Sequence, residues 1–260
     1  MNAITLNQLE LRLDGFSLKP SNIAIPQGHI TALIGKNGAG KTTLFKTLHG
    51  LYHHYTGQMS ILGMTYRNHE KEIRTKMGVM YDALTTNPNV LPQKILQLTR
   101  AFYPGFDNSL FDDMVQRLDI KLDQRLRKQS LGMQRKFIFA LTLATRKEIL
   151  LLDEPFNGID PIYKKIMMEY IQTLMENDTQ TVIISSHQVD DLEKISDYVM
   201  IMDKGTIKLN ENKESLLESY AFSPETKIIE KTSNPSQAHQ YPVSLEDIFV
   251  HLVGGHDERV

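Results

Sequence analysis

The sequence predicts an α/β fold built on a doubly wound parallel sheet, and three features indicate it. The apolar run at residues 30–34 (ITALI) leads into a glycine-rich loop and then a helical segment. Residues 149–152 (ILLL) form a second short apolar run, and residues 181–184 (TVII) form a third strand-like run; a helical segment follows each. Strands buried on both faces of a parallel sheet have this composition, and they alternate with helices along the chain.

The segments around the first run are expected to form strands and one helix. Near the N-terminus, apolar and polar residues alternate over part of the segment, and the apolar ones are Ile4, Leu6, Leu9, Leu11 and Leu13. Such alternation is typical of half-buried strands. The helix after the loop carries Leu44, Phe45 and Leu48 at helical spacing and is expected to end at Gly50. Glycines and short apolar runs in residues 51–80 predict hairpins and a returning strand.

Residues 84–147 are expected to form a helical insertion between strands. Residues 93–103 and 109–118 have helical period and are separated by Pro104-Gly105. A third helical run covers residues 134–145.

The doubly wound pattern returns after the insertion. A helix is expected at residues 161–175, where Pro161 suits the first turn, and a shorter one near residues 189–195. Residues 198–209 predict a hairpin that turns at Lys204-Gly205. Residues 222–241 indicate a weakly packed linker or a small β extension, and residues 245–252 predict a final amphipathic helix.

Composition limits the possible classes of function. The 260 residues suit one large domain, with or without a small appendage. Lys and Arg number 29 and Asp and Glu 31, and the formal net charge of −2 gives no argument for nucleic acid. Cysteine is absent, which excludes disulfides and thiolate metal sites. The N-terminus has no signal-peptide pattern, and no apolar run approaches the ~18 residues of a membrane helix. We therefore expect a soluble chain that meets a membrane only through a partner.

A phosphate-binding loop of the form G-x-x-x-x-G-K-[ST] follows residues 30–34. Its residues are Gly35, Lys36, Asn37, Gly38, Ala39, Gly40, Lys41 and Thr42. The glycines permit a tight turn whose N–H groups face anionic oxygens, and the helix that begins near Lys41 adds its positive dipole end. Lys41 can reach the β- and γ-phosphates of a nucleotide, and the Thr42 hydroxyl can bind Mg²⁺.

Two carboxylates and a histidine are expected at the same edge of the sheet. Asp153 and Glu154 close the strand at residues 149–152, and His187 closes the next one. Ligands of open parallel sheets bind outside the carboxyl ends of the strands, where the phosphate loop also lies. Asp153 suits a role on Mg²⁺, and Glu154 suits a base that orients and deprotonates water. His187 can contact the γ-phosphate or that water.

Ser130, Leu131, Gly132 and Met133 precede the helical run at residues 134–145. A Ser-x-Gly turn at a helix start can bind an anion through its hydroxyl, its N–H groups and the helix dipole. From these residues alone, a plain N-cap by Ser130 is favoured.

The order of these parts resembles the nucleotide-binding subunit of ATP-binding cassette (ABC) transporters over nearly the whole chain. Residues 35–43, including Thr43, resemble the Walker A loop, and residues 149–154 resemble Walker B with its catalytic glutamate. Residues 157–160 (NGID) resemble the D-loop, and His187 the switch histidine. Residues 129–133 (QSLGM) resemble the signature motif, usually Leu-Ser-Gly-Gly-Gln.

The resemblance implies a P-loop NTPase of the ABC ATPase fold. Its parts would be an N-terminal antiparallel β subdomain, a RecA-like parallel-sheet core and a helical subdomain at about residues 84–147. Residues 1–220 would form the ATPase domain, and residues 221–260 a C-terminal extension with a closing helix.

The same resemblance implies a mechanism and partners. Two such domains, identical or related, would sandwich two ATP molecules with Mg²⁺, and hydrolysis would energise a membrane-spanning subunit. Ser130 and Gly132 would act on the ATP held by the partner domain. The chain would lie peripherally on the cytoplasmic face of the cell membrane, with no nucleic acid partner.

Some positions depart from the family pattern. Gln129, Leu131 and Met133 replace the usual Leu, Gly and Gln of the signature. Asp82 stands where the family has the glutamine of its Q-loop, and the resemblance implies that the Asp82 carboxylate faces Mg²⁺ or water. No tyrosine is evident for stacking on adenine, and Phe16 is the nearest aromatic residue.

Softer similarities narrow the resemblance to bacterial antimicrobial-peptide and multidrug exporter ATPases, often encoded beside a GntR-type regulator. They lie in residues 101–107, in Tyr81-Asp82 and in residues 245–249. Two alternatives stay open: a soluble ABC ATPase that remodels ribosomes or DNA, and a non-hydrolysing regulatory subunit. The single phosphate loop and the balanced charge count against the first, and Glu154 and His187 against the second.

Overall fold

The computed structural model describes residues 1–82, 87–176, 180–223, 228–232 and 242–254. Its centre is a six-stranded sheet with the order β5-β6-β7-β3-β8-β9. The strands are β3 (Ile30–Ile34), β5 (Met77–Met80), β6 (Ile149–Asp153), β7 (Thr181–Ser186), β8 (Tyr198–Asp203) and β9 (Thr206–Asn212). The pairings are parallel except that β9 runs antiparallel to β8. The α/β fold with a parallel core is therefore confirmed.

Burial on both faces explains the composition of the central strands. Every residue of β3, β6 and β7 is buried. Successive residues of a strand point to opposite faces, so Leu150 and Leu152 enter one hydrophobic core while Ile149 and Leu151 enter another. A strand between two cores has no polar face, which is why these runs show no alternation.

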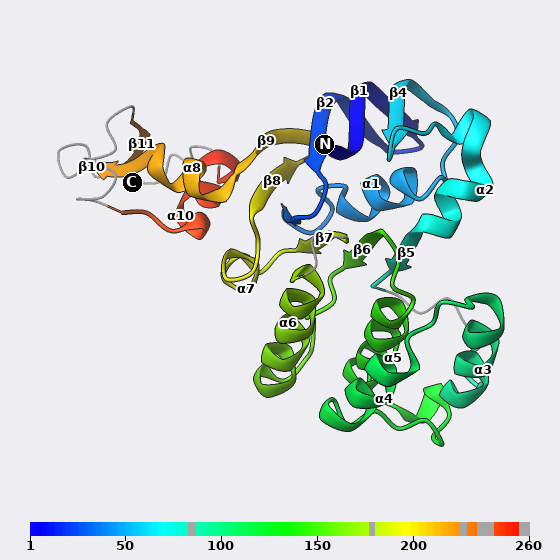
Figure 1. The fold of residues 1–260 in the computed structure, drawn as a ribbon. Helices are drawn as coiled ribbons and strands as arrows, with labels where there is room; N and C mark the ends of the chain where they lie inside the picture. Colours follow the sequence, from blue (N-terminus) through cyan, green and yellow to red (C-terminus); the bar gives the residue numbers. More distant parts are fainter. Residues whose placement is uncertain (83–86, 177–179, 224–227, 233–241, 255–260) are drawn as a thin grey trace.

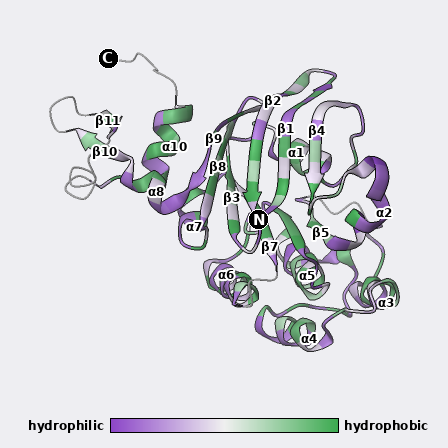
Figure 2. Cartoon of the chain, turned by 45° about the horizontal axis from the view of Figure 1, so that its top comes forward, coloured by the Kyte–Doolittle hydropathy of each residue, from purple (hydrophilic) through white to green (hydrophobic). Residues whose placement is uncertain are grey.

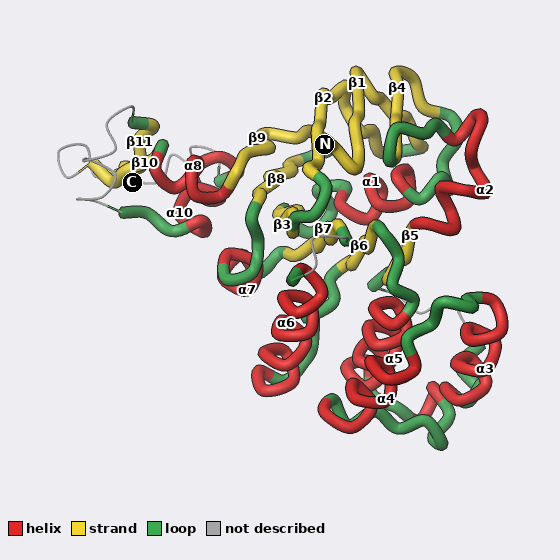
Figure 3. The backbone as a smooth tube through the Cα atoms, in the orientation of Figure 1, coloured by secondary structure: helices red, strands yellow, loops and turns green. Residues whose placement is uncertain are grey.

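An antiparallel sheet of order β2-β1-β4 forms the predicted N-terminal subdomain. Its strands are β1 (Asn2–Leu13), β2 (Phe16–Pro26) and β4 (Tyr55–Ile61). Helix α1 (Lys41–Leu48) shares one core with this sheet and with one face of the central sheet. Figure 3 shows the strands of this subdomain gathered beside α1.

Helices cover the other face of the central sheet (Figure 1), and those before residue 147 form the predicted helical subdomain. The helices on this face are α3 (Pro92–Phe102), α4 (Asn108–Arg117), the 3-10 turn η1 (Leu126–Lys128), α5 (Leu131–Ala144), α6 (Pro161–Met175) and α7 (Val189–Glu193). Side-chain caps fix two of the starts: Asp107 accepts a hydrogen bond from Leu110 N at 2.9 Å, and Asp160 accepts one from Ile162 N at 2.9 Å. Residues 84–86 of the predicted insertion lie outside the described residues.

One prediction for residues 51–80 was wrong. The returning strand exists as β5, but helix α2 (Tyr66–Lys76) stands where hairpins were expected. Only Tyr66 and Ile73 of this helix are buried, and Figure 2 shows it largely in the hydrophilic colour. Two buried side chains are too few to show the helical period of apolar residues in the sequence, and the glycines on either side of the segment favoured turns instead.

The C-terminal part contains α8 (Lys213–Glu218), β10 (Tyr220–Ser223), β11 (Ile228–Lys231) and α10 (Leu245–Val253). Strands β10 and β11 pair antiparallel, as a small β extension would, although residues 224–227 and 233–241 lie outside the described residues. Helix α10 begins at a capping box formed by Ser244 and Asp247. Its Leu245 and Ile248 are buried in the core that also holds the apolar side chains of α5 and α6. The division of the chain at residue 220 stays a prediction.

Candidate functional site

The loop between β3 and α1 has a backbone that only glycine suits at two positions. Gly38 and Gly40 have φ of +80° and +109°, in the left-handed region. A Cβ on Gly40 would lie 2.5 Å from Phe16 Cζ, and one on Gly35 would lie 2.6 Å from the Met202 carbonyl oxygen. The loop is thus packed tightly from outside. The N–H groups of Gly35 and Ala39 donate to the Ser186 and Lys36 carbonyls, and the N-terminus of α1 remains for an anion.

Lys41 is buried at the start of α1 and is held by oxygen atoms. Its ammonium donates to the Gly35 carbonyl at 2.7 Å and lies 3.2 Å from Glu154 Oε1. A buried ammonium needs such partners. Lys41 therefore lies at the loop as an ammonium with fixed partners, and its predicted reach to the β- and γ-phosphates stays a prediction.

Asp153 is fully buried at the end of β6 and accepts two short hydrogen bonds. The Thr42 hydroxyl donates to its Oδ2 at 2.6 Å, and the Ser185 hydroxyl donates to its Oδ1 at 2.5 Å. Burial raises the pKa of Asp153, the neighbouring charges of Glu154 and Asp82 add to the rise, and the two hydroxyls oppose it. Thr42 and Asp153, each expected to act on Mg²⁺, are therefore in direct contact.

Glu154 follows Asp153 in a strained conformation. Its φ of +50° places a non-glycine residue in the left-handed region, which costs of order 1–3 kcal/mol and is common at functional sites. Its N–H donates to Ser185 at 3.1 Å (Oγ) and 3.2 Å (carbonyl). Its Oε2 lies 2.9 Å from His187 Nδ1. Glu154 and His187, which were both expected at this edge of the sheet, are thus in contact beside Lys41.

These residues surround a hollow of about 320 Å³. Its lining residues are Phe16, Asn37, Gly38, Ala39, Gly40, Lys41, Thr42, Thr43, Asp82 and Glu154. Lys36, although part of the loop, donates instead to the Val253 carbonyl of α10 at 3.4 Å. The hollow therefore combines a glycine loop, one buried cation, two carboxylates and one aromatic ring.

Ser130 and Gly132 lie at the N-terminus of α5 and do not line this hollow. The Ser130 hydroxyl accepts a hydrogen bond from Met133 N at 3.2 Å, so the N-cap favoured by the sequence is present. A Cβ on Gly132 would lie 2.8 Å from the Gly158 carbonyl oxygen. Glycine is therefore needed for the close approach of α5 to the loop after β6. Their predicted action on a partner's ATP stays a prediction.

Asp82 reaches the hollow from the end of β5. Its carboxylate forms an ion pair with Arg135 of α5. Its predicted role on Mg²⁺ stays a prediction.

Two residues of the site were missed from the sequence. Ser185, which contacts both Asp153 and Glu154, could have been found, because the polar pair Ser185-Ser186 closes an otherwise apolar strand just before His187. Arg135 gave no such signal, since its partner Asp82 lies 53 residues away.

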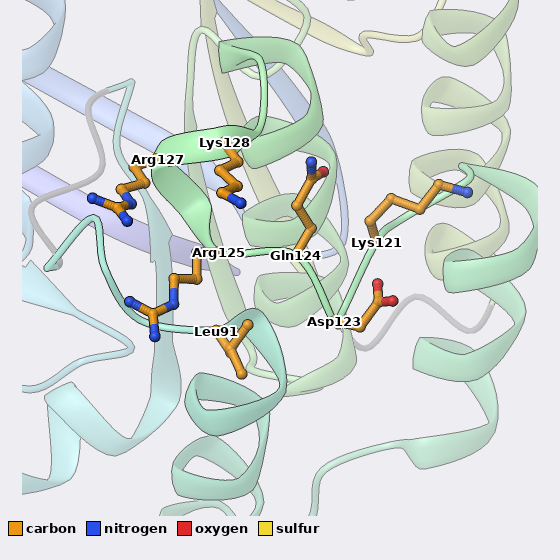
Figure 4. A pocket seen from close by; sticks show the side chains of 7 residues that line it. All are labelled: Leu91, Lys121, Asp123, Gln124, Arg125, Arg127 and Lys128. Carbon is orange, nitrogen blue, oxygen red and sulfur yellow. The ribbon is translucent and has the colours of Figure 1, made fainter.

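A larger hollow of about 750 Å³ lies away from the phosphate loop, in the helical subdomain. Its lining residues are Leu91, Lys121, Asp123, Gln124, Arg125, Arg127 and Lys128. Figure 4 shows Arg125, Arg127 and Lys128 on one side, and Lys121 and Asp123 on the other. The Lys121 ammonium lies 2.6 Å from Asp119 Oδ1. The basic run before Ser130 thus lines an open surface hollow, as a solvated basic segment does.

The oxygen donors fit a magnesium ion that is shared with phosphates. No group of three or more His, Asp or Glu side chains within the described ranges could hold a metal. Mg²⁺ needs no such cage, since it is commonly bound by one or two protein oxygens together with waters and nucleotide phosphates. Thr42 Oγ1 and Asp153 Oδ2, 2.6 Å apart beside the loop, supply that kind of donor set.

Among the helices of the described residues, none has the length and apolar character to cross a membrane.

The central sheet, the phosphate loop and the carboxylates at the strand ends define a P-loop nucleotide-binding protein. The sequence model of the family described as "ABC transporter" matches residues 18–157, and this chain belongs to that family. It is therefore an ABC-type ATPase, as the resemblance implied.

Curated relatives and a solved structure agree with this assignment. Over 236 residues the chain is 29% identical to the bacitracin transport ATP-binding protein BcrA of Bacillus licheniformis, covering 87% of this chain and 77% of that one. It is 24% identical to the ABC transporter ATP-binding protein YtrB of Bacillus subtilis (strain 168), covering 97% and 98%. A structure described as the ATP binding subunit of an ABC transporter superposes with a TM-score of 0.78 at 19% identity, over 96% and 99% of the chains, and supports the fold.

Proposed function

We propose that this chain hydrolyses ATP between two nucleotide-binding subunits and thereby drives export through a membrane-spanning partner. The observation that carries the proposal is the arrangement of Glu154, which reaches the phosphate hollow while touching both Lys41 and His187. A carboxylate held by two cationic or titratable groups is placed to orient a water molecule at the γ-phosphate.

Each residue then has a role that follows from its position. The N–H groups at the N-terminus of α1 and the Lys41 ammonium bind the β- and γ-phosphates of ATP. Thr42 and Asp153 would hold Mg²⁺, which would supply positive charge to neutralise the phosphates. Glu154 accepts a proton from the attacking water, and His187 holds the Glu154 carboxylate in place.

The second subunit completes the site in this proposal. Ser130 and Gly132 of one subunit would face the ATP held by Lys41 of the other, whether the pair is identical or related. Closure is favoured because ATP contacts both subunits only in the closed pair. The membrane-spanning partner would place the chain on the cytoplasmic face of the cell membrane. Similarity to the bacitracin transport protein supports transport, and export as its direction is part of the proposal.

Replacing Glu154 by Gln tests the catalytic proposal. The variant should bind ATP as the natural chain does and lose turnover, since an amide cannot accept the proton. Glu169→Gln is a matched control, because Glu169 lies on α6 in an ion pair with Arg117 at 2.8 Å and away from the hollow. Steady-state phosphate release is measured for both. Full turnover by Glu154→Gln would remove Glu154 from this role.

Co-purification tests the transport proposal. The tagged chain, expressed in its native host and extracted from detergent-solubilised membranes, should retain a polytopic membrane protein. Recovery with ribosomes or with DNA, and with no membrane protein, would favour the alternative of a soluble remodelling ATPase.

A further inference from the structure

Arg135 connects three segments beside the phosphate hollow. It lies on α5, and only 13% of its side chain is exposed. One guanidinium nitrogen pairs with the Asp82 carboxylate after β5. The other terminal nitrogen donates to the Asn157 carbonyl after β6 at 2.8 Å. A guanidinium is rarely buried without such partners, so this charge is fixed in position.

Three carboxylates lie close together at this hollow. Asp82 and Glu154 line it, and Asp153 accepts a hydrogen bond from Thr42, which also lines it. The charges of Glu154 and Asp82 both act on Asp153, since each raises its pKa in addition to the larger effect of burial. Glu154 is compensated by Lys41 at 3.2 Å. For Asp82, the compensating cation is Arg135.

We propose that Arg135 is a positioning residue that neutralises Asp82 and so allows the hollow to accept a triphosphate. The inference rests on the proposed function, because a triphosphate is the ligand that an unpaired Asp82 would repel. The bond to Asn157 keeps the guanidinium over Asp82, where it cannot swing away into solvent. Arg135 therefore acts on the nucleotide through Asp82 and not by direct contact.

A double-mutant cycle separates this electrostatic role from packing. Arg135→Gln should raise the Kd of ATP with Mg²⁺ roughly tenfold at low salt, since one unscreened charge pair near a surface has this size of effect. Asp82→Asn should lower the Kd roughly threefold, because Arg135 is then unpaired beside the phosphates. The variant with both changes should return to within about twofold of the natural chain. Added salt should shrink all three differences.

Controls make each outcome decisive. Arg117→Gln removes a matched arginine–carboxylate pair between α4 and α6 and should leave the Kd unchanged. Arg135→Lys keeps the charge and should stay close to the natural Kd, and circular dichroism confirms that each variant is folded.

The proposal is overturned if Asp82→Asn fails to rescue Arg135→Gln, or if Arg135→Lys binds as weakly as Arg135→Gln; either result means a packing role. It is also overturned if Asp82→Asn alone weakens binding, which would indicate a direct metal contact by Asp82. A natural chain that binds no ATP would instead contradict the proposed function.

Discussion

The Ser185 hydroxyl offers the sharpest test of how the buried carboxylates are held. It donates to Asp153 Oδ1 at 2.5 Å inside the sheet, and it also accepts from Glu154 N–H at 3.1 Å. Ser185→Ala removes both contacts while leaving the backbone of β7 intact. The Glu154 N–H keeps the Ser185 carbonyl, 3.2 Å away, so the principal loss is the bond to the Asp153 carboxylate.

The magnitude follows from the charge of the acceptor. A hydrogen bond to an ionised group contributes about 1.5–3 kcal/mol, so the free energy of unfolding should fall by about 2 kcal/mol. For a chain of this size that is roughly 4–8 °C in Tm. Thermal unfolding followed by circular dichroism at neutral pH measures it.

Ser196 provides the matched control. It is buried, and within the described part of the chain its hydroxyl has no hydrogen-bond partner. Removing an unpaired buried hydroxyl is close to neutral, so Ser196→Ala should change Tm by less than about 2 °C. Equal Tm losses in Ser185→Ala and Ser196→Ala would refute the reasoning, since they would show that the bond to Asp153 contributes nothing of its own.

Further predictions concern pH and the base of the nucleotide. Burial raises the pKa of Asp153 in the folded chain above its value in the unfolded chain. Asp153 therefore stabilises the fold at pH values below its unfolded pKa, and this contribution is lost as the pH rises through its folded pKa. The Tm measured without Mg²⁺ or nucleotide should therefore fall as pH rises, with a midpoint above the ordinary aspartate range. Ser185→Ala should move that midpoint upward, and an unshifted pH profile would contradict this. Phe16 lines the hollow, so if it stacks on adenine, Phe16→Ala should weaken ATP binding roughly tenfold and leave the affinity for inorganic triphosphate unchanged; equal losses for both ligands would contradict stacking.

The central sheet and the phosphate loop were predictable because their signals are local. A five-residue apolar strand, a glycine loop and a helix stand next to one another between Ile30 and Leu48. The end of β6 likewise carries its two carboxylates within adjacent positions. By contrast, α2 was missed because most of its residues are charged or polar and exposed, and its few buried side chains leave no helical period.

The contacts that hold the charged side chains of the site in position were not predictable, because they join residues far apart in sequence. Arg135 sits five positions after Ser130 on α5, where a basic residue suits an exposed helical surface equally well. Only the packing of α5 against the ends of β5 and β6 makes it a partner of Asp82 and Asn157. Ser185 is intermediate, since its place at a strand end is visible but its two partners are not.

The central claim is that ATP is bound at the phosphate loop and joins two subunits. Light scattering of the size-separated Glu154→Gln chain, with ATP and Mg²⁺ and then with ADP and Mg²⁺, tests it most directly. The expected molar mass is near twice the 29.8 kDa of one chain with ATP, and that of a single chain with ADP. A single chain that carries bound ATP at saturating nucleotide would contradict it.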